Sequence, residues 1–445
     1  RPSLARADKY LTGNLKRKFL TNPGAGFSIY PLPQAPPNTP LNPRFYMPQA
    51  LSPSREQALL LTLMAAQFTN ILDFMIMMPL SAQLMAVFDI STGQFGLLIS
   101  AYSLSAGATA LVASAILDRY DRRRVLLLSY SGLILATAAC ALAPNHIMML
   151  VARCMAGLFG GVATSIVMAI VGDVIPLERR GRAMGVVMLA FSLASVAGVP
   201  AGIWIADHFS WQAPFICVAA VSCVVLLGCW VWVPSLTEHV AAKHENLLQS
   251  YRGLLSNTNH LWAFATSFLV MLAGFMTIPY IAPSLVSNAG LSHSQLPYIY
   301  LLGGALTLIT RPLIGRITDR HRHALVLNVL MAISLIPIVL VSQTLPLGLP
   351  YQLLVAGLFF VFVSGRFIPC SAMVTASCTP QYRGRVMSFN SAVMNLGSGL
   401  AAMLAGYIMT SDEAGRLVHY DWVGYISGVI TLVGMRVAWR VRPVS

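Results

Sequence analysis

The sequence is poor in charged residues. Only 10% of its 445 residues are Asp, Glu, Lys or Arg, whereas 56% are hydrophobic. A soluble domain carries roughly 25% charged residues, so this composition excludes an ordinary water-soluble fold. No Cys-x-x-Cys pair occurs among the seven cysteines, so we expect neither a disulfide framework nor a metal site. A phosphate-binding motif of the Gly-x4-Gly-Lys-Ser/Thr type and a catalytic constellation are also missing. We therefore expect no enzyme, no cofactor and no direct use of ATP.

Long apolar runs are abundant instead. Runs of about 20 residues recur along the chain, and each is long enough to cross a hydrocarbon core about 30 Å thick. The sequence thus predicts an all-α polytopic membrane protein with twelve transmembrane helices. The predicted spans are 58–85, 95–117, 125–143, 147–174, 183–206, 213–234, 261–287, 296–314, 324–342, 350–376, 386–409 and 421–439.

The spans fall into two related halves. A polar cytoplasmic linker, residues 235–260, separates a first bundle of six spans (58–234) from a second (261–440). PLERRGRAMG at 176–185 resembles PQYRGRVMS at 380–388, and ILDR at 116–119 resembles ITDR at 317–320. Both repeats are about 200 residues apart and follow equivalent spans. Two pseudo-symmetric six-helix bundles in parallel orientation, with a site between them near the midplane, are typical of transporters.

Residues 1–57 differ from the rest of the chain. This predicted cytoplasmic tail holds ten of the 26 prolines and a basic Lys-Arg-Lys cluster at 16–18. Such a composition favours extended polyproline-type chain over a packed domain. Two interpretations stay open: a tail that lies near anionic lipid, and a docking arm for a protein partner.

Positive charge is concentrated in the connections that follow the second, fourth, eighth and tenth spans. The connections after the odd-numbered spans, up to the ninth, hold no Lys or Arg. Positive loops stay in the cytoplasm, so both termini are predicted to be cytoplasmic. The net charge of +14 is therefore explained by membrane topology, and no nucleic acid is expected as a partner. The lipid bilayer, in particular a bacterial inner membrane, is the expected environment.

Several motifs resemble the major facilitator superfamily. SAILDRYDRR at 114–123 is similar to the family's pattern G-x-x-x-D-R-x-G-R-[KR], although Ser114 and Asp121 stand where the family has glycine. RCMAGLFGG at 153–161 resembles the family's R-x-x-x-G pattern. AGVPAG at 197–202 resembles the antiporter motif of the drug and sugar efflux branches, with an interrupted Gly-Pro pair. The resemblance covers residues 58–440, implies the major facilitator fold, and does not identify a substrate.

The resemblance implies two conformational elements. The first is a latch that clamps the outward-open state, formed by Asp118, Arg119, Arg122, Asp319 and Arg320. The alternative for the arginines is plain positive-inside topology. The second is a kink in the fifth span at Gly198, Pro200 and Gly202, because a proline within a helix removes one backbone hydrogen bond.

Asp73 lies inside an apolar span. An intramembrane carboxylate costs about 2.5–3.5 kcal/mol on insertion scales and so marks a functional site. Asn70 and Gln67 precede it by one and two turns, and Arg153 and Arg366 are the other deep charges. We expect these five residues to form a proton- and substrate-binding site in a central cavity. The alternative is a structural salt bridge, for instance between Asp73 and Arg153.

These patterns predict a secondary active transporter. It would export a small organic compound by alternating access, in antiport with protons carried by Asp73. One alternative is a transporter-like subunit of a larger membrane assembly, docked through residues 1–57. Another is an importer of a small molecule or of a metal, since the methionine spacing in MGVVM (184–188) suits Cu(I), although packing is the commoner role of methionine.

Overall fold

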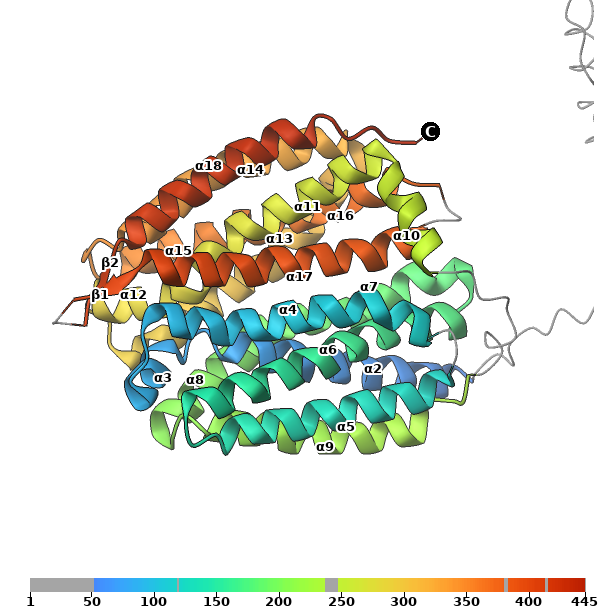
Figure 1. The fold of residues 1–445 in the computed structure, drawn as a ribbon, viewed down its shortest axis with the longest axis horizontal. Coiled ribbons are helices and arrows are strands. Elements are labelled where there is room, and N and C mark those ends of the chain that lie inside the picture. The colour runs from blue at the N-terminus through green and yellow to red at the C-terminus, as the bar shows by residue number, and fades with distance from the viewer. Residues whose placement is uncertain (1–51, 118–119, 237–246, 380–382, 413–414, 445) are drawn as a thin grey trace, which may run out of the picture. The chain divides into compact units, whose positions relative to one another are not determined.

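The computed structural model describes residues 52–117, 120–236, 247–379, 383–412 and 415–444 (Figure 1). Most of the predicted tail, and with it the predicted docking arm, lies outside these ranges. The first described helix, α2, begins at Pro53, inside the segment that the sequence assigns to the tail. Because proline lacks a backbone N–H, it is well suited to the first turn of a helix.

The described part of the first bundle contains nine helical elements. They are α2 Pro53–Ile76, α3 Ser81–Phe88, α4 Thr92–Leu117, α5 Arg122–Ala141, α6 His146–Val174, α7 Leu177–Leu193, a π-helical segment Ala194–Gly198, α8 Val199–His208 and α9 Ala213–Trp232.

The second bundle follows the short helix α10, Leu247–Ser256, which lies in the predicted linker. Its helices are α11 Thr258–Thr277, a 3-10 turn Ile278–Tyr280, α12 Ile281–Ser287, a 3-10 turn His293–Gln295, α13 Leu296–Arg320, α14 His323–Gln343, α15 Leu349–Gly365, α16 Phe367–Ala376, α17 Arg383–Ile408 and α18 Tyr420–Ala438. Two short antiparallel strands, β1 Thr410–Ser411 and β2 Leu417–Val418, form a hairpin before α18.

Eleven segments of the described chain are long and apolar enough to cross a membrane. The 19-residue α18 is not among them, and it carries Asp421 in its first turn and Arg436 in its last. It nevertheless packs against α11 and α14 as a member of the second bundle, and so completes the predicted set of twelve. The predicted all-α membrane fold is confirmed.

Several predicted spans are interrupted helices. The span predicted at 58–85 breaks around Pro79, between α2 and α3. The span at 261–287 breaks at Ile278–Tyr280, which contains Pro279. The span at 350–376 breaks at Arg366, between α15 and α16. Hydropathy measures how apolar a segment is, and it does not detect the loss of a backbone hydrogen bond.

The two ends of the bundles differ in charge. We call the end that carries the arginine-rich connections the basic end, and the other the opposite end. The basic end holds the starts of α2, α5, α7, α11, α14 and α17. Helices α4 and α17, far apart in the sequence, run side by side across the middle of the molecule and join the two bundles (Figure 1).

Hydrogen bonds connect α4 and α17 toward the opposite end. The Ser100 hydroxyl donates to the carbonyl of Gly399 at 2.6 Å, and the Thr92 hydroxyl donates to the carbonyl of Met409 at 2.8 Å. The Tyr280 hydroxyl, from the turn after α11, donates to the carbonyl of Ala402 at 3.0 Å. This seam therefore combines backbone acceptors with small residues, which lets the helices approach closely.

Among the described residues, the apolar core is continuous between the bundles at one end only. At the opposite end one cluster of buried side chains includes Leu72 and Ile76 of the first bundle together with Met276 and Phe359 of the second. Toward the basic end the two bundles have separate cores, one around Tyr130 and Ile166 and another around Phe264 and Met331. The described chain is thus fused by packing at the opposite end.

Candidate transport site

Asp73 forms a buried ion pair with Arg153. Asp73 lies in the last turn of α2 and Arg153 in α6, and their side chains are 1% and 0% exposed. Arg153 Nη1 lies 3.0 Å from Asp73 Oδ2 and also donates to the Asp73 carbonyl at 3.2 Å. The Thr137 hydroxyl, on α5, donates to Asp73 Oδ1 at 2.9 Å. Helices α5 and α6 therefore supply the groups that hydrogen-bond and neutralise this carboxylate of α2 inside the first bundle.

Two glycines of the fifth span bring that span close to Asp73. A Cβ atom on Gly198 would lie 2.9 Å from Leu72 Cδ1, and one on Gly202 would lie 2.1 Å from Ile76 Cδ1. Leu72 and Ile76 flank Asp73 on α2. The π-helical segment Ala194–Gly198 ends two residues before Pro200, so the helix changes its hydrogen-bonding pattern at the predicted kink. Such π-segments are frequent at functional sites.

A second polar cluster lies one turn from the ion pair. The Tyr102 hydroxyl, on α4, donates to Asn70 Oδ1 at 2.8 Å. Asn70 Nδ2 donates to the carbonyl of Gly160 at 3.1 Å and to the hydroxyl of Thr164 at 2.7 Å. Gln67 Nε2 lies 3.5 Å from the same hydroxyl.

The two clusters are in contact through Tyr102. The Arg153 guanidinium carbon lies 4.6 Å from the centre of the Tyr102 ring, which is a cation–π contact. Four of the five predicted site residues, Gln67, Asn70, Asp73 and Arg153, therefore belong to one buried network that connects α2, α4, α5 and α6.

Arg366, the fifth predicted site residue, lies in the second bundle. It is fully buried at the break between α15 and α16. Its Nη1 lies 3.4 Å from the Ser334 hydroxyl and 3.3 Å from the Thr431 hydroxyl, and its Nη2 has no hydrogen-bond partner in the described chain. The structure does not bring Arg366 together with the Asp73 network by any hydrogen bond between described residues.

The predicted latch is only partly within the described chain. Asp118 and Arg119 lie outside it. Arg122, at the start of α5, forms an ion pair of 3.0 Å with Asp173 near the end of α6. Asp319 and Arg320, in the last turn of α13, are exposed and form no ion pair with another described residue.

Asp121 has a structural role that the sequence analysis did not anticipate. Its carboxylate caps α5 by accepting from the backbone N–H of Arg123 at 3.1 Å. It also accepts from the N–H of Leu236 at 2.8 Å and from the hydroxyl of Ser235 at 2.9 Å. Burial opposes ionisation, but these hydrogen bonds and nearby Arg124 lower the pKa of Asp121 below its ordinary value.

Thr137 and Tyr102 are site residues that sequence reasoning missed. Both are buried polar side chains in predicted spans, at 2% and 7% exposure. Their positions relative to Asp73 depend on how α4 and α5 pack against α2, and hydropathy carries no signal for that packing. Among the described residues no group of three His, Cys, Asp or Glu could hold a metal ion.

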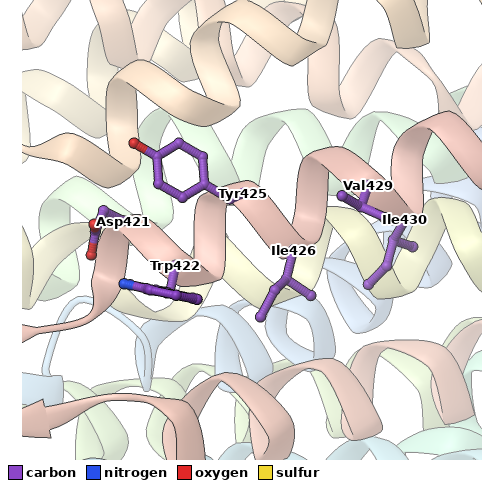
Figure 2. Close-up of a pocket in the computed structure, with 6 residues that line it drawn as sticks. All are labelled: Asp421, Trp422, Tyr425, Ile426, Val429 and Ile430. Carbon is purple, nitrogen blue, oxygen red and sulfur yellow. The ribbon is translucent and has the colours of Figure 1, made fainter.

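A groove of about 580 Å³ lies along α18, away from the charged network. Figure 2 shows the six residues that line it, all on this one helix. They are Asp421, Trp422, Tyr425, Ile426, Val429 and Ile430. Because the lining is almost wholly apolar and exposed, the groove suits lipid chains better than a polar solute, and we place the candidate site at the charged network instead.

Two joined helical bundles with interrupted membrane helices and a buried ion pair define a polytopic membrane transporter. The family model of the Major Facilitator Superfamily matches residues 63–365 and 325–445. The chain belongs to this superfamily, and it is a transporter rather than an enzyme.

Known proteins of the same family cover most of the chain. The uncharacterised MFS-type transporter YceJ of Bacillus subtilis is 24% identical over 82% of this chain and 91% of its own length. A chloramphenicol resistance protein of Streptomyces lividans is 26% identical over 80% of this chain and 88% of its own. The crystal structure of a D-xylose–proton symporter has a TM-score of 0.72 at 14% identity, and the match covers 87% of this chain and 98% of that one. This last likeness shows the fold alone.

Proposed function

We propose that the protein exports a small organic compound in exchange for protons, with Asp73 as the proton carrier. The observation that supports this proposal is the Asp73–Arg153 pair, which lies within the membrane-spanning part of the first bundle. Breaking a buried pair by removing one charge costs about 3–5 kcal/mol, because the other charge is left uncompensated. Protonation of Asp73 removes one charge in the same way, so it would release Arg153 and favour a different packing of the helices.

The elements around Asp73 suit such a switch. Its flanking residues Leu72 and Ile76 pack on the two glycines that border Pro200, so a change at α2 would reach the π-helical segment directly. Leu72 and Ile76 also belong to the core that both bundles share. Packed side chains of this kind can carry the coupling between a local charge and the motion of two bundles.

The orientation that we propose places the basic end in the cytoplasm, following the positive-inside rule. Because the described residues of the two bundles share a core only at the opposite end, this orientation corresponds to a state that is closed to the outside. A bacterial inner membrane is the proposed location, in line with bacterial relatives. The resistance protein of Streptomyces lividans favours export over import, because export is the direction by which a transporter confers resistance.

The first experiment compares Asp73→Asn with the matched variant Asp89→Asn. Asp89 is exposed at the end of α3 in the left-handed conformation, which asparagine also tolerates. Accumulation of a panel of lipophilic dyes would be measured in a bacterium that lacks its own efflux transporters, with and without the proton gradient. We expect wild type and Asp89→Asn to lower dye accumulation only while the proton gradient is present. Asp73→Asn should leave dye accumulation as high as in cells without the protein.

A double variant separates coupling from folding. Asp73→Asn with Arg153→Gln removes both charges, so no unpaired charge is left in the first bundle and the protein should be made at near-normal levels. Loss of gradient-driven export in this double variant is the expected result. Gradient-driven export at the wild-type rate would show that the pair is structural and would contradict the proposal.

A further inference from the structure

One face of α13 packs toward the first bundle and includes polar side chains. Tyr300, Gly304, Thr307 and Arg311 are spaced by three or four residues and so lie on one side of this helix. A Cβ atom on Gly304 would lie 2.9 Å from the backbone of Val196, in the π-helical segment. This face of α13 therefore lies against the fifth span, between the two bundles.

Arg311 on this face contacts an aromatic ring of the other bundle. Its guanidinium carbon lies 4.3 Å from the centre of the Phe191 ring, on α7. Arg311 lies nine positions before the end of α13 at Arg320, about 13 Å along the helix axis at 1.5 Å per residue. The predicted span ends at residue 314, so Arg311 lies about 5 Å inside the hydrocarbon core, on the side of the midplane toward the basic end, where the described parts of the two bundles have separate cores.

The membrane interior carries more positive than negative charge. The described ion pairs are Asp73–Arg153, Arg122–Asp173 and Arg179–Glu56. Arg311 and Arg366 belong to none of them, and Arg311 Nε has no hydrogen-bond partner in the described chain. With Asp73 already paired to Arg153, neither Arg311 nor Arg366 has a carboxylate partner among the described residues.

We propose that the transported compound is an organic anion and that Arg311 binds its carboxylate or equivalent acidic group. This inference rests on the proposed export function and adds the class of substrate. Arg311 as a whole is half-buried between the bundles, one face of its guanidinium lies on Phe191, and its buried Nε has no hydrogen-bond partner in the described chain. A planar acid can accept from such a fork through two oxygens.

Arg366 would act differently from Arg311. It is enclosed among α14, α15 and α18 and is 0% exposed, so it does not reach a solute between the bundles. Its positive charge would nevertheless favour an anion nearby, since charges interact strongly in a medium of low dielectric constant.

The experiment uses inverted membrane vesicles, in which export appears as uptake. Two fluorescent probes with related ring systems are compared: carboxyfluorescein, an anion, and rhodamine 123, a cation. The variants are Arg311→Gln, Arg311→Lys and the control Arg316→Gln, which removes an exposed arginine of the same helix. Each is tested with and without a proton gradient.

We expect wild type and Arg316→Gln to take up carboxyfluorescein and not rhodamine 123. Arg311→Gln should lower that uptake at least about tenfold, the usual cost of losing a hydrogen bond to a charged group, and Arg311→Lys should retain part of it.

Preferential uptake of rhodamine 123, or unchanged uptake of carboxyfluorescein by Arg311→Gln, overturns the anion proposal while leaving proton-driven export standing. Arg311-dependent uptake that ignores the gradient overturns proton coupling instead. Uptake of neither probe by wild type contradicts both proposals.

Discussion

At the scale of the residue, Asp121 shows how a departure from a family pattern acquires its own structural role. It stands where the family pattern has glycine, and it accepts three hydrogen bonds, two of them from Ser235 and Leu236 at the start of the interbundle linker. The N–H of Arg122 donates in turn to the carbonyl of Leu236 at 3.3 Å. The linker is thereby tied to the connection between α4 and α5.

This anchoring predicts a pH-dependent loss of stability in Asp121→Ala. Loss of a helix cap costs about 1 kcal/mol, and the linker contacts add to that cost. Because the native pKa of Asp121 is lowered, its contribution is complete above the ordinary aspartate pKa of about 3.9 and is lost as the pH falls through the lowered value. In detergent, the melting temperature of the variant should therefore lie below that of wild type at pH 7. The difference between the two melting temperatures should become smaller near pH 3.

The exposed Asp207 on α8 provides the comparison for this prediction, because it makes no hydrogen bond through its side chain in the described chain. Asp207→Ala should melt like wild type at both pH values. A gap between wild type and Asp121→Ala that stayed constant down to pH 3 would show that the carboxylate charge is irrelevant.

At the scale of the element, the glycines of α6 determine how closely it approaches α4. A Cβ atom on Gly157 would lie 2.1 Å from the carbonyl oxygen of Tyr102, and one on Gly160 would lie 2.5 Å from the Tyr102 hydroxyl. Between membrane helices, packing of this kind replaces the hydrophobic effect as a source of association. The same contacts hold Tyr102 over Arg153.

Gly157→Ala should therefore destabilise the protein, whereas Gly172→Ala on the same helix should not. Overpacking against backbone typically costs about 1–3 kcal/mol, and nothing lies within 4 Å of a Cβ atom at Gly172. Alanine also has the higher helix propensity, so the control should be neutral or slightly stabilising. The melting temperatures of the two purified variants in detergent provide the measurement, and equal values would contradict the assignment of Gly157 to a tight contact.

The sequence was sufficient to predict which segments are membrane helices but not their internal breaks. Hydropathy detects the part of a helix that lies in the hydrocarbon core, so the predicted span ends at residue 314, before Arg316 and Arg320. Helix α13 itself continues to Arg320. Breaks at Pro79 and Arg366 change hydrogen bonding within runs that stay apolar. Of the site, an isolated acid such as Asp73 stands out in the sequence, whereas Thr137 and Tyr102 become its neighbours only through packing between helices.

At the scale of the whole molecule, the seam between the bundles at the opposite end controls which state is populated. A Cβ atom on Gly406 would lie 2.6 Å from the carbonyl oxygen of Thr92 and 2.6 Å from the Tyr280 hydroxyl. One neighbour is a backbone atom and the other ends a rigid aromatic side chain, so neither can move aside easily. Any side chain at this position must therefore separate α4 from α17, where Thr92 and Met409 are hydrogen-bonded.

Gly406→Ala should shift the molecule toward a state that is open at the opposite end. The variant would be made in a background without native cysteines, with Met276→Cys as a reporter that is 1% exposed in the shared core. Its labelling rate by a water-soluble maleimide should rise severalfold in Gly406→Ala. Gly384→Ala, on the same helix with nothing within 4 Å, should leave the rate unchanged. A rate that rose equally in both variants would indicate general destabilisation.

The single shared core also has a pharmacological consequence. A rigid molecule entering from the basic end would meet two bundles whose described apolar cores are already separate, so it could act as a wedge without displacing a core that both bundles share. A molecule entering from the opposite end would have to displace side chains that both bundles contribute. Inhibitors of this protein should therefore be most effective when they are permeant enough to approach from the side of the arginine-rich loops.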